Sequence, residues 1–158
     1  MEVSLGIDYG DARTGVAIAY GDGPAVPSGA VDSSGGRNST ARAVCGIAKE
    51  KNAGLVVIGL PYNMDGSKGR RAVLTEKFAK ALEKCLAESR LSVRIGFFDE
   101  RLTSRSAESE LRSVSAGTPA KGASDSVAAS IILQNYLDSR KAGNTGVVPD
   151  IGGDENNG

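Results

Sequence analysis

One stretch near the start of the chain, "VSLGIDYGDARTGVAIAY" (residues 3–20), limits most strongly what the sequence can fold into. Read with the period of two of a β-strand, the large apolar residues of its first half share one face, while Ser4, Gly6 and Asp8 share the other. One face therefore belongs to a core, and the other carries only small side chains and one carboxylate. A carboxylate inside a sheet costs several kcal/mol unless a hydrogen-bond network, a cation or a metal ion compensates it. Asp8 therefore needs a partner.

The rest of the chain predicts three opening strands followed by alternating helices and strands. Short apolar runs separated by Gly, Asp and Pro predict an antiparallel meander, and the continuous run "LVVIGLP" predicts a strand buried on both faces. The expected strands cover residues 3–9, 14–20, 25–32, 55–61 and 91–97, and the expected helices begin at Ser39 or Thr40, cover about 67–89, lie near 103–115, and cover 124–141.

This order predicts an α/β fold with a mixed five-stranded sheet: three antiparallel strands, then parallel βαβ units, with helices on both faces. The topology is that of the ribonuclease H fold. The length suits one domain, which we expect over residues 1–142. Residues 143–158 are rich in Gly, Asn and Asp, so we expect a disordered tail there.

The cysteines indicate the cellular compartment of the protein, and the charge indicates which kinds of partner it can bind. Cys45 and Cys85 are isolated on apolar helix faces and predict buried free thiols in a reducing compartment. No run is apolar enough for a membrane span, and the start "MEVS" leaves no room for a targeting peptide, so we expect a cytoplasmic protein, or an organellar one if the sequence is a trimmed precursor. Nineteen basic residues balance nineteen acidic ones, but three acids lie beyond residue 149, so residues 1–149 carry +3. This charge permits a nucleic-acid partner without requiring one.

Ligands of open α/β sheets gather at the carboxyl ends of the parallel strands. Asp99 and Glu100 stand at such an end, and Asp125 begins the last helix. Each has an ordinary explanation, as solvated loop acids or as a first-turn acid behind a Ser124 cap. Taken together with Asp8, however, they predict a carboxylate cage for two Mg²⁺ or Mn²⁺ ions, which is typical of phosphodiester hydrolysis by a two-metal-ion mechanism.

The chain contains no histidine. This excludes a histidine general base, a Ser-His-Asp triad and histidine-ligated zinc, and leaves water activated by a metal ion as the expected nucleophile. Strand alternation places Asp99 and Glu100 on opposite faces. We prefer Glu100 as the ligand because its longer side chain reaches further toward Asp8, with Asp99 as the alternative.

The segment "GLPYNMDGSKGRR" joins a buried strand to a helix, and we interpret it as a clamp for the phosphate backbone. Its ordinary explanation is a turn at Asp65-Gly66 followed by a Ser67 helix cap, and both can hold. The expected substrate-binding residues, some from this segment and some beside the acids, are Arg13, Asn63, Lys68, Arg70, Arg71 and Arg101.

Four motifs, "GIDYGDARTGVA", "VVIGLPYNMDGS", "DERLTS" and "DSVAASIIL", follow one another in an order and spacing that resemble the YqgF family over residues 3–138. These are RuvC-like nucleases of pre-16S ribosomal RNA, also called Holliday junction resolvase-like proteins. The resemblance implies an RNase H-like fold, Mg²⁺- or Mn²⁺-dependent cleavage, and maturation of the 5′ end of 16S rRNA, in contact with pre-ribosomal RNA or a ribosomal particle. By motif position it implies Asp8, an acid of "DER" and Asp125 as metal ligands.

Other functions stay open at this point. The chain could resolve branched DNA junctions, or act in ribosome assembly or transcription as a non-catalytic module that binds RNA or protein. The first hairpin also resembles the phosphate loop of actin-like and sugar-kinase ATPases, but those enzymes need a duplicated domain, and this chain has room for one copy. The sequence does not decide whether the substrate is RNA or DNA, which metal is bound, or whether the protein is a monomer or a homodimer.

Overall fold

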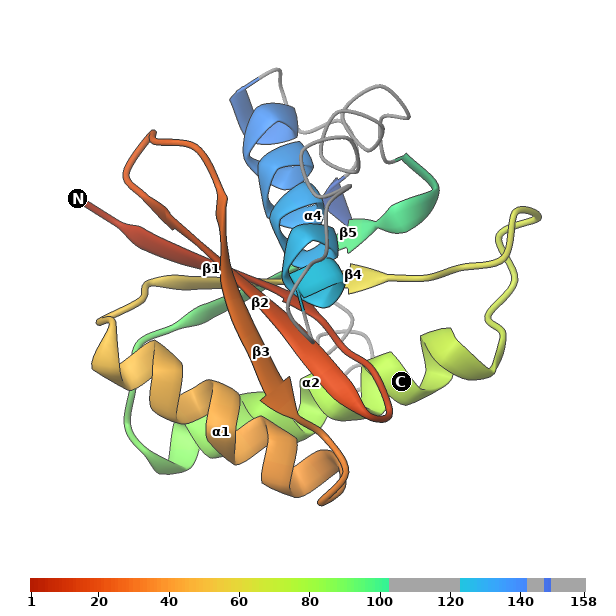
Figure 1. Cartoon of the computed structure of the whole chain (residues 1–158), viewed down its shortest axis with the longest axis horizontal. Coiled ribbons are helices and arrows are strands. Elements are labelled where there is room, and N and C mark those ends of the chain that lie inside the picture. The colour runs from red at the N-terminus through yellow and green to blue at the C-terminus, as the bar shows by residue number, and fades with distance from the viewer. Residues whose placement is uncertain (103–122, 142–146, 149–158) are drawn as a thin grey trace, which may run out of the picture.

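The computed structural model describes residues 1–102, 123–141 and 147–148 (Figure 1). Three strands open the domain: β1 (Val3–Asp8), β2 (Arg13–Tyr20) and β3 (Val26–Asp32). β2 pairs antiparallel with both β1 and β3, so the predicted meander is confirmed.

The remaining described elements are α1 (Arg37–Glu50), β4 (Leu55–Leu60), α2 (Arg70–Glu88), β5 (Arg94–Asp99), the 3₁₀ turn η1 (Glu100–Leu102), α4 (Ala123–Lys141) and β6 (Val147–Val148). The strands form one sheet in the order β3-β2-β1-β4-β5-β6, in which β1, β4 and β5 run parallel. The predicted mixed sheet is therefore confirmed. The helix predicted near 103–115 lies outside the described residues.

The sheet has one more strand than the sequence predicted. The two residues of β6 pair antiparallel with Phe97 and Phe98 of β5. This strand, Val147–Val148, falls inside the segment 143–158 that was expected to be disordered. The other residues of the segment lie outside the described part of the chain.

Two helix starts differ from the prediction. α1 is capped by Gly36 and not by Ser39 or Thr40, and the Thr40 hydroxyl donates to the Gly36 carbonyl at 2.8 Å. A threonine inside the first turn bonds back to the preceding turn, and therefore does not cap.

α2 begins at Arg70, after Gly69, so the prediction that Ser67 caps this helix is wrong. The Ser67 N–H and hydroxyl both donate to one carboxylate oxygen of Asp65, at 2.9 and 2.6 Å. Ser67 thus closes the turn with Asp65, before the helix, and Gly69 takes the N-cap position.

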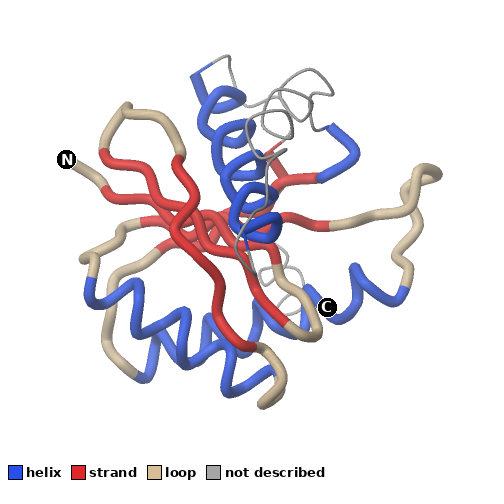
Figure 2. Tube along the Cα trace, viewed as in Figure 1, coloured by secondary structure: helices blue, strands red, loops and turns tan. Residues whose placement is uncertain are grey.

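Helices cover both faces of the sheet: α1 and α2 lie on one face and α4 lies on the other (Figures 1 and 2). The large apolar residues of β1 join the core under α1 and α2, as expected. The small residues of β1 face α4, where a Cβ on Gly6 would lie 2.6 Å from the Leu133 Cβ. The face cleared of bulk therefore makes room for a helix.

β5 begins at Arg94, three residues later than predicted, yet Leu91 and Val93 still pack against the core from the connecting segment. The alternation of apolar residues before Arg94 therefore reflects burial against the core and not strand geometry. Both cysteines are free thiols, Cys45 buried and Cys85 half-buried. Among the described residues, no helix is both long enough and apolar enough to cross a membrane.

Candidate active site

Asp8 is the last residue of β1, at the carboxyl end of the parallel strands. Its partner across the antiparallel ladder is Gly15. A Cβ on Gly15 would lie 1.9 Å from the backbone oxygen of Asp125, so only glycine lets the first turn of α4 come this close to the sheet. This close approach brings Asp125 beside Asp8.

Glu100 reaches the same place from the other side. It stands two residues after Phe98, which packs in the core beneath α4, whereas Phe97 packs in the core beneath α1 and α2. The Glu100 side chain turns back over β4, because its Oε2 lies 2.8 Å from where a Cβ on Gly59 would be. The missing side chain at Gly59 leaves the space that the Glu100 carboxylate fills.

The electrostatics show that these acids act on one another. Burial, and then repulsion from Asp125, raise the pKa of Asp8 to about 6, against the opposing effect of Arg71. Burial, and then repulsion from Asp8, raise the pKa of Glu100 to about 7, again opposed by Arg71. The Asp8 and Glu100 carboxylates therefore lie in a poorly solvated region, and the negative charge on Asp125 acts on Asp8 from beside it. A bound cation would relieve this excess of negative charge.

Asp99 differs from Glu100 in its surroundings, although the two residues are adjacent in sequence. Its buried carboxylate accepts from Arg101 through Nε at 3.0 Å and through Nη2 at 2.5 Å. Burial would raise the pKa of Asp99, but the hydrogen bonds from Arg101 outweigh it and hold that pKa below its usual value. Asp99 thus has its cation, and the pair fixes the turn that carries Glu100.

Asp125 lies in the first turn of α4 and accepts from Nε of Arg13 at 2.9 Å. Across the ranges 1–102, 123–141 and 147–148, no three side chains of the kinds that bind metals already converge on one point. The donor set nevertheless fits a hard divalent cation, since it consists of carboxylate oxygens from three separate elements and two of those carboxylates lack full compensation.

The basic residues of the predicted clamp have partners within the protein. Arg71 donates through Nη2 to the Tyr9 carbonyl at 2.5 Å, and its Nη1 lies 3.3 Å from the Asp11 carboxylate. Lys68 pairs with Glu76 at 3.0 Å. The structure therefore places Arg71 as a counter-charge behind the acids, a position that sequence spacing could not reveal.

The other predicted substrate contacts vary in exposure. Arg70 is 75% exposed and lies 3.7 Å from Asp11, so it is available to a ligand. Asn63 donates to the Ser67 hydroxyl at 3.0 Å, inside its own loop. Arg101 is committed to Asp99, and its guanidinium lies 5.6 Å from the centre of the Tyr62 ring. Their contacts to substrate stay predictions.

Sequence reasoning missed the two glycines that make the site possible, Gly15 and Gly59. A glycine inside a strand often marks a close backbone approach, and both stand in strands in the printed sequence. A glycine in a strand indicates that another part of the chain packs closely against it, but not which residue does so.

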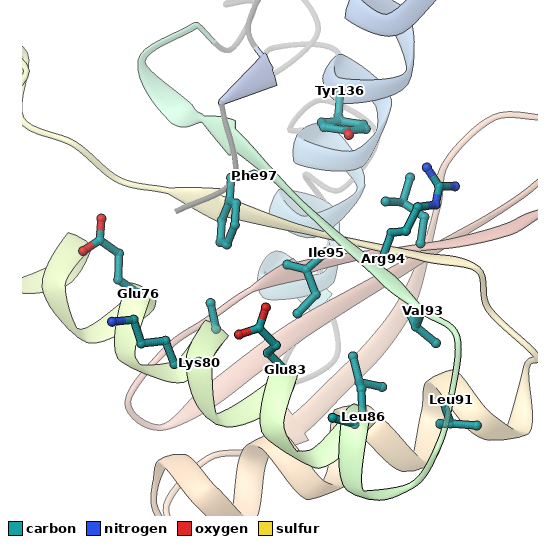
Figure 3. Close-up of a pocket in the computed structure, with 13 residues that line it drawn as sticks. Glu76, Lys80, Glu83, Leu86, Leu91, Val93, Arg94, Ile95, Phe97 and Tyr136 are labelled. Atoms are coloured by element: carbon teal, nitrogen blue, oxygen red, sulfur yellow. The ribbon is translucent and has the colours of Figure 1, made fainter. Parts of the chain in front are cut away.

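A cavity of about 490 Å³ lies elsewhere, between α2 and β5 (Figure 3). Glu76, Lys80, Ile95 and Phe97 are among its lining residues, with Tyr136 reaching it from α4. None of the three clustered acids lines it, so this cavity is separate from the candidate site.

Comparisons with known proteins find relatives that cover most of this chain. A protein from Synechococcus sp. is 40% identical over 139 residues, 87% of this chain and 90% of its own length, and carries the name "Putative pre-16S rRNA nuclease". A protein of the same name from Chloroflexus aurantiacus is 39% identical over 144 residues, 89% of this chain and 90% of its own.

Solved structures match the fold. Thermus thermophilus RuvC in complex with a Holliday junction substrate superposes with a TM-score of 0.64 at 14% identity, covering 94% of this chain and 100% of that one. The yeast mitochondrial Holliday junction resolvase Ydc2 gives 0.51 at 12% identity, covering 89% and 81%. The ribonuclease H fold predicted from element order is thereby confirmed, and the structures that match it are RuvC-like.

A model of the family described as "RuvX: Holliday junction resolvase" matches residues 2–139. This range contains all four motifs on which the resemblance rests. The chain therefore belongs to the RuvX family, the YqgF family that its motifs indicated.

Proposed function

We propose that this protein is a nuclease that hydrolyses phosphodiester bonds of nucleic acid with divalent cations held by Asp8, Glu100 and Asp125. The observation that supports this most is that Asp8 of β1 is repelled by Asp125 of α4 and in turn repels Glu100 of η1. Burial, and then these repulsions, raise the pKa of Asp8 and of Glu100. A protein that only binds nucleic acid gains nothing from concentrating negative charge where a phosphate would lie.

Mg²⁺ or Mn²⁺ would fit these ligands, because both cations prefer oxygen donors and are bound through a few carboxylates. Bound there, the ions would supply Lewis-acid chemistry that activates a water molecule and stabilises the leaving oxygen. In this proposal Asp99 is not a ligand, since it is paired with Arg101.

The chain's own residues would set the geometry and the pH range. Asp8 is fixed at the end of a central strand, and the pair of Asp99 with Arg101 holds the turn from which Glu100 extends. Carboxylates bind metal only when deprotonated. With the pKa of Asp8 at about 6 and that of Glu100 at about 7, metal affinity rises as pH increases through this range.

The substrate is proposed from the relatives. Two proteins about 40% identical to this chain bear the name of a pre-16S rRNA nuclease, which favours precursor ribosomal RNA. The family description names a Holliday junction resolvase, which makes branched DNA the second candidate.

A cleavage assay tests the proposal. The purified protein is incubated with a pre-16S rRNA fragment, an unrelated single-stranded RNA and a four-way DNA junction, each with Mg²⁺, Mn²⁺ or EDTA. We expect metal-dependent cleavage, strongest on the rRNA precursor, and none by the Glu100→Gln variant. Preferred cleavage of the junction would transfer the assignment to DNA. Absence of cleavage with every metal and substrate would leave the non-catalytic binding module as the better function.

A further inference from the structure

Arg13 and Asp125 form an ion pair that joins β2 to α4 at the edge of the candidate site. Resting on the proposed function, we propose that Arg13 exchanges partners: it pairs with Asp125 in the metal-free protein, and a divalent ion that takes Asp125 releases it to bind a phosphate of the nucleic acid. Arg13 would thus couple metal binding to substrate binding.

The side chain of Arg13 can move while its backbone stays in place. Arg13 is the first residue of β2 and pairs with Asp32 of β3, and the next residue, Thr14, is fully buried. The Arg13 side chain itself is 39% exposed and meets a carboxylate that is 27% exposed. Nothing in this contact is enclosed, so the guanidinium can leave without a change in the sheet.

Arg71 provides the contrast. It also lies near the acids, but it donates to a backbone carbonyl, that of Tyr9, and lies beside Asp11. Those partners are not the proposed metal ligands. A metal ion at Asp8 and Glu100 would therefore leave the contacts of Arg71 intact, whereas one at Asp125 would compete directly with Arg13.

The exchange follows from simple electrostatics. The Arg13 Nε lies 2.9 Å from the Asp125 oxygen, which is the kind of atom that a divalent ion would coordinate. A guanidinium and a divalent ion on one carboxylate repel each other, and the ion carries twice the charge. Once released, the planar guanidinium is well suited to a phosphate, which it can bind through two parallel hydrogen bonds.

Two consequences of opposite sign distinguish this role from an ordinary phosphate contact. Removing Arg13 removes a competitor for Asp125, so metal binds more tightly. Removing it also removes a phosphate contact, but only when metal is present, because without metal Arg13 is occupied. By linkage, metal and nucleic acid then strengthen each other's binding in the native protein but less so in the variant.

The first measurement is calorimetric titration of the metal-free protein with Mn²⁺ at pH 8. We expect Arg13→Ala to lower the dissociation constant about two- to five-fold, the range for an exposed ion pair that no longer has to be broken. Arg70→Ala is the control, since it removes the same charge from a residue that pairs with Asp11 instead. Its effect on the dissociation constant should be smaller.

The second measurement is fluorescence anisotropy of a labelled single-stranded RNA oligonucleotide, with Ca²⁺ to fill the oxygen site or with EDTA. We expect Arg13→Ala to weaken RNA binding with Ca²⁺, to lower the salt slope by about 0.7, and to leave RNA affinity in EDTA unchanged. If Arg13→Ala fails to fold, Arg13→Gln replaces it.

The outcomes separate the two proposals. If the native protein binds neither Mn²⁺ nor Ca²⁺, the proposed function is wrong at its metal site. If the native protein binds metal but Arg13→Ala binds it equally or more weakly, the exchange is wrong and the nuclease stands. An equal loss of RNA affinity with Ca²⁺ and with EDTA would also refute the exchange, because Arg13 would then contact phosphate whether or not metal is bound.

Discussion

Replacing Asp8 by asparagine should abolish cleavage and at the same time stabilise the metal-free protein. Asp8 is the proposed ligand with the most central position, at the carboxyl end of β1 between β2 and β4. Asparagine keeps the shape of the side chain and removes its charge. The substitution therefore separates the electrostatic cost of this carboxylate from its packing.

The magnitude follows from the pKa of Asp8, which is about 6 in the fold and 3.8 ordinarily. The folded state keeps this proton to a higher pH than the unfolded chain, so the stability of the native protein falls as pH rises from about 4 to about 6, and the loss is complete above that. The difference of about two pKa units corresponds to about 3 kcal/mol. Asparagine escapes this loss, which already includes the attraction to Arg71, but its amide must still be buried, so we expect a gain of about 1–3 kcal/mol.

Thermal unfolding in EDTA at pH 5 and pH 8 measures this effect. For a chain of this length the gain corresponds to roughly 3–10 °C in melting temperature at pH 8. It should be about half as large at pH 5, because the loss builds up between about pH 4 and about pH 6. Asp22→Asn, at an exposed turn, is the matched control and should show neither effect. A variant less stable than the native protein at pH 8 would mean that Asp8 makes a stabilising contact. An equal gain at both pH values would mean that charge is not the cause.

Three further substitutions test other parts of the site. Asp99→Asn should destabilise the protein by about 1–3 kcal/mol in urea unfolding, because the buried carboxylate that pairs with the Arg101 guanidinium is lost. It should weaken Mg²⁺ binding less than Glu100→Gln does. The reverse order of metal affinities would make Asp99 the ligand. Gly15→Ala should lower the free energy of unfolding by about 1–3 kcal/mol or more, because its methyl group would meet the α4 backbone. The control Gly46→Ala, in open space on α1, should be neutral or stabilising. Similar results for both variants would contradict the close approach of α4 to Gly15. Arg70→Ala should lower the salt slope of RNA binding by about 0.7–0.9, and an unchanged slope would show that Arg70 only faces solvent.

The backbone architecture was predictable because its signals are local. The period-two pattern around Asp8 located β1 and its cleared face, and the order of elements located the carboxyl edge where the acids gather. The parity of strand β5 placed Asp99 and Glu100 on opposite faces, and the structure has them so, with Glu100 over Gly59 on the side of α4. Whether Glu100 binds metal stays a prediction.

The sequence could not predict which of several partners in space a side chain contacts. Ser67 was expected to cap α2, but it bonds to Asp65 in the preceding turn, and Gly69 is the N-cap. Sequence spacing could not show that Arg71 lies against the Tyr9 carbonyl, 62 positions away in sequence. Its contact with substrate stays a prediction. The partner of Asp125 is likewise 112 positions away. Such pairings depend on how helices dock on the sheet, which periodicity does not encode.

The central claim is that Asp8, Glu100 and Asp125 together hold divalent cations. Calorimetric titration of the metal-free protein with Mg²⁺ and Mn²⁺, paired with the shift of its melting temperature, tests this without any knowledge of the substrate, because a ligand that binds only the folded state raises the melting temperature. We predict saturable binding heat and a rising melting temperature for the native protein, and loss of both in Glu100→Gln and Asp125→Asn. A native protein that gives no binding heat and no shift at millimolar metal would contradict the account.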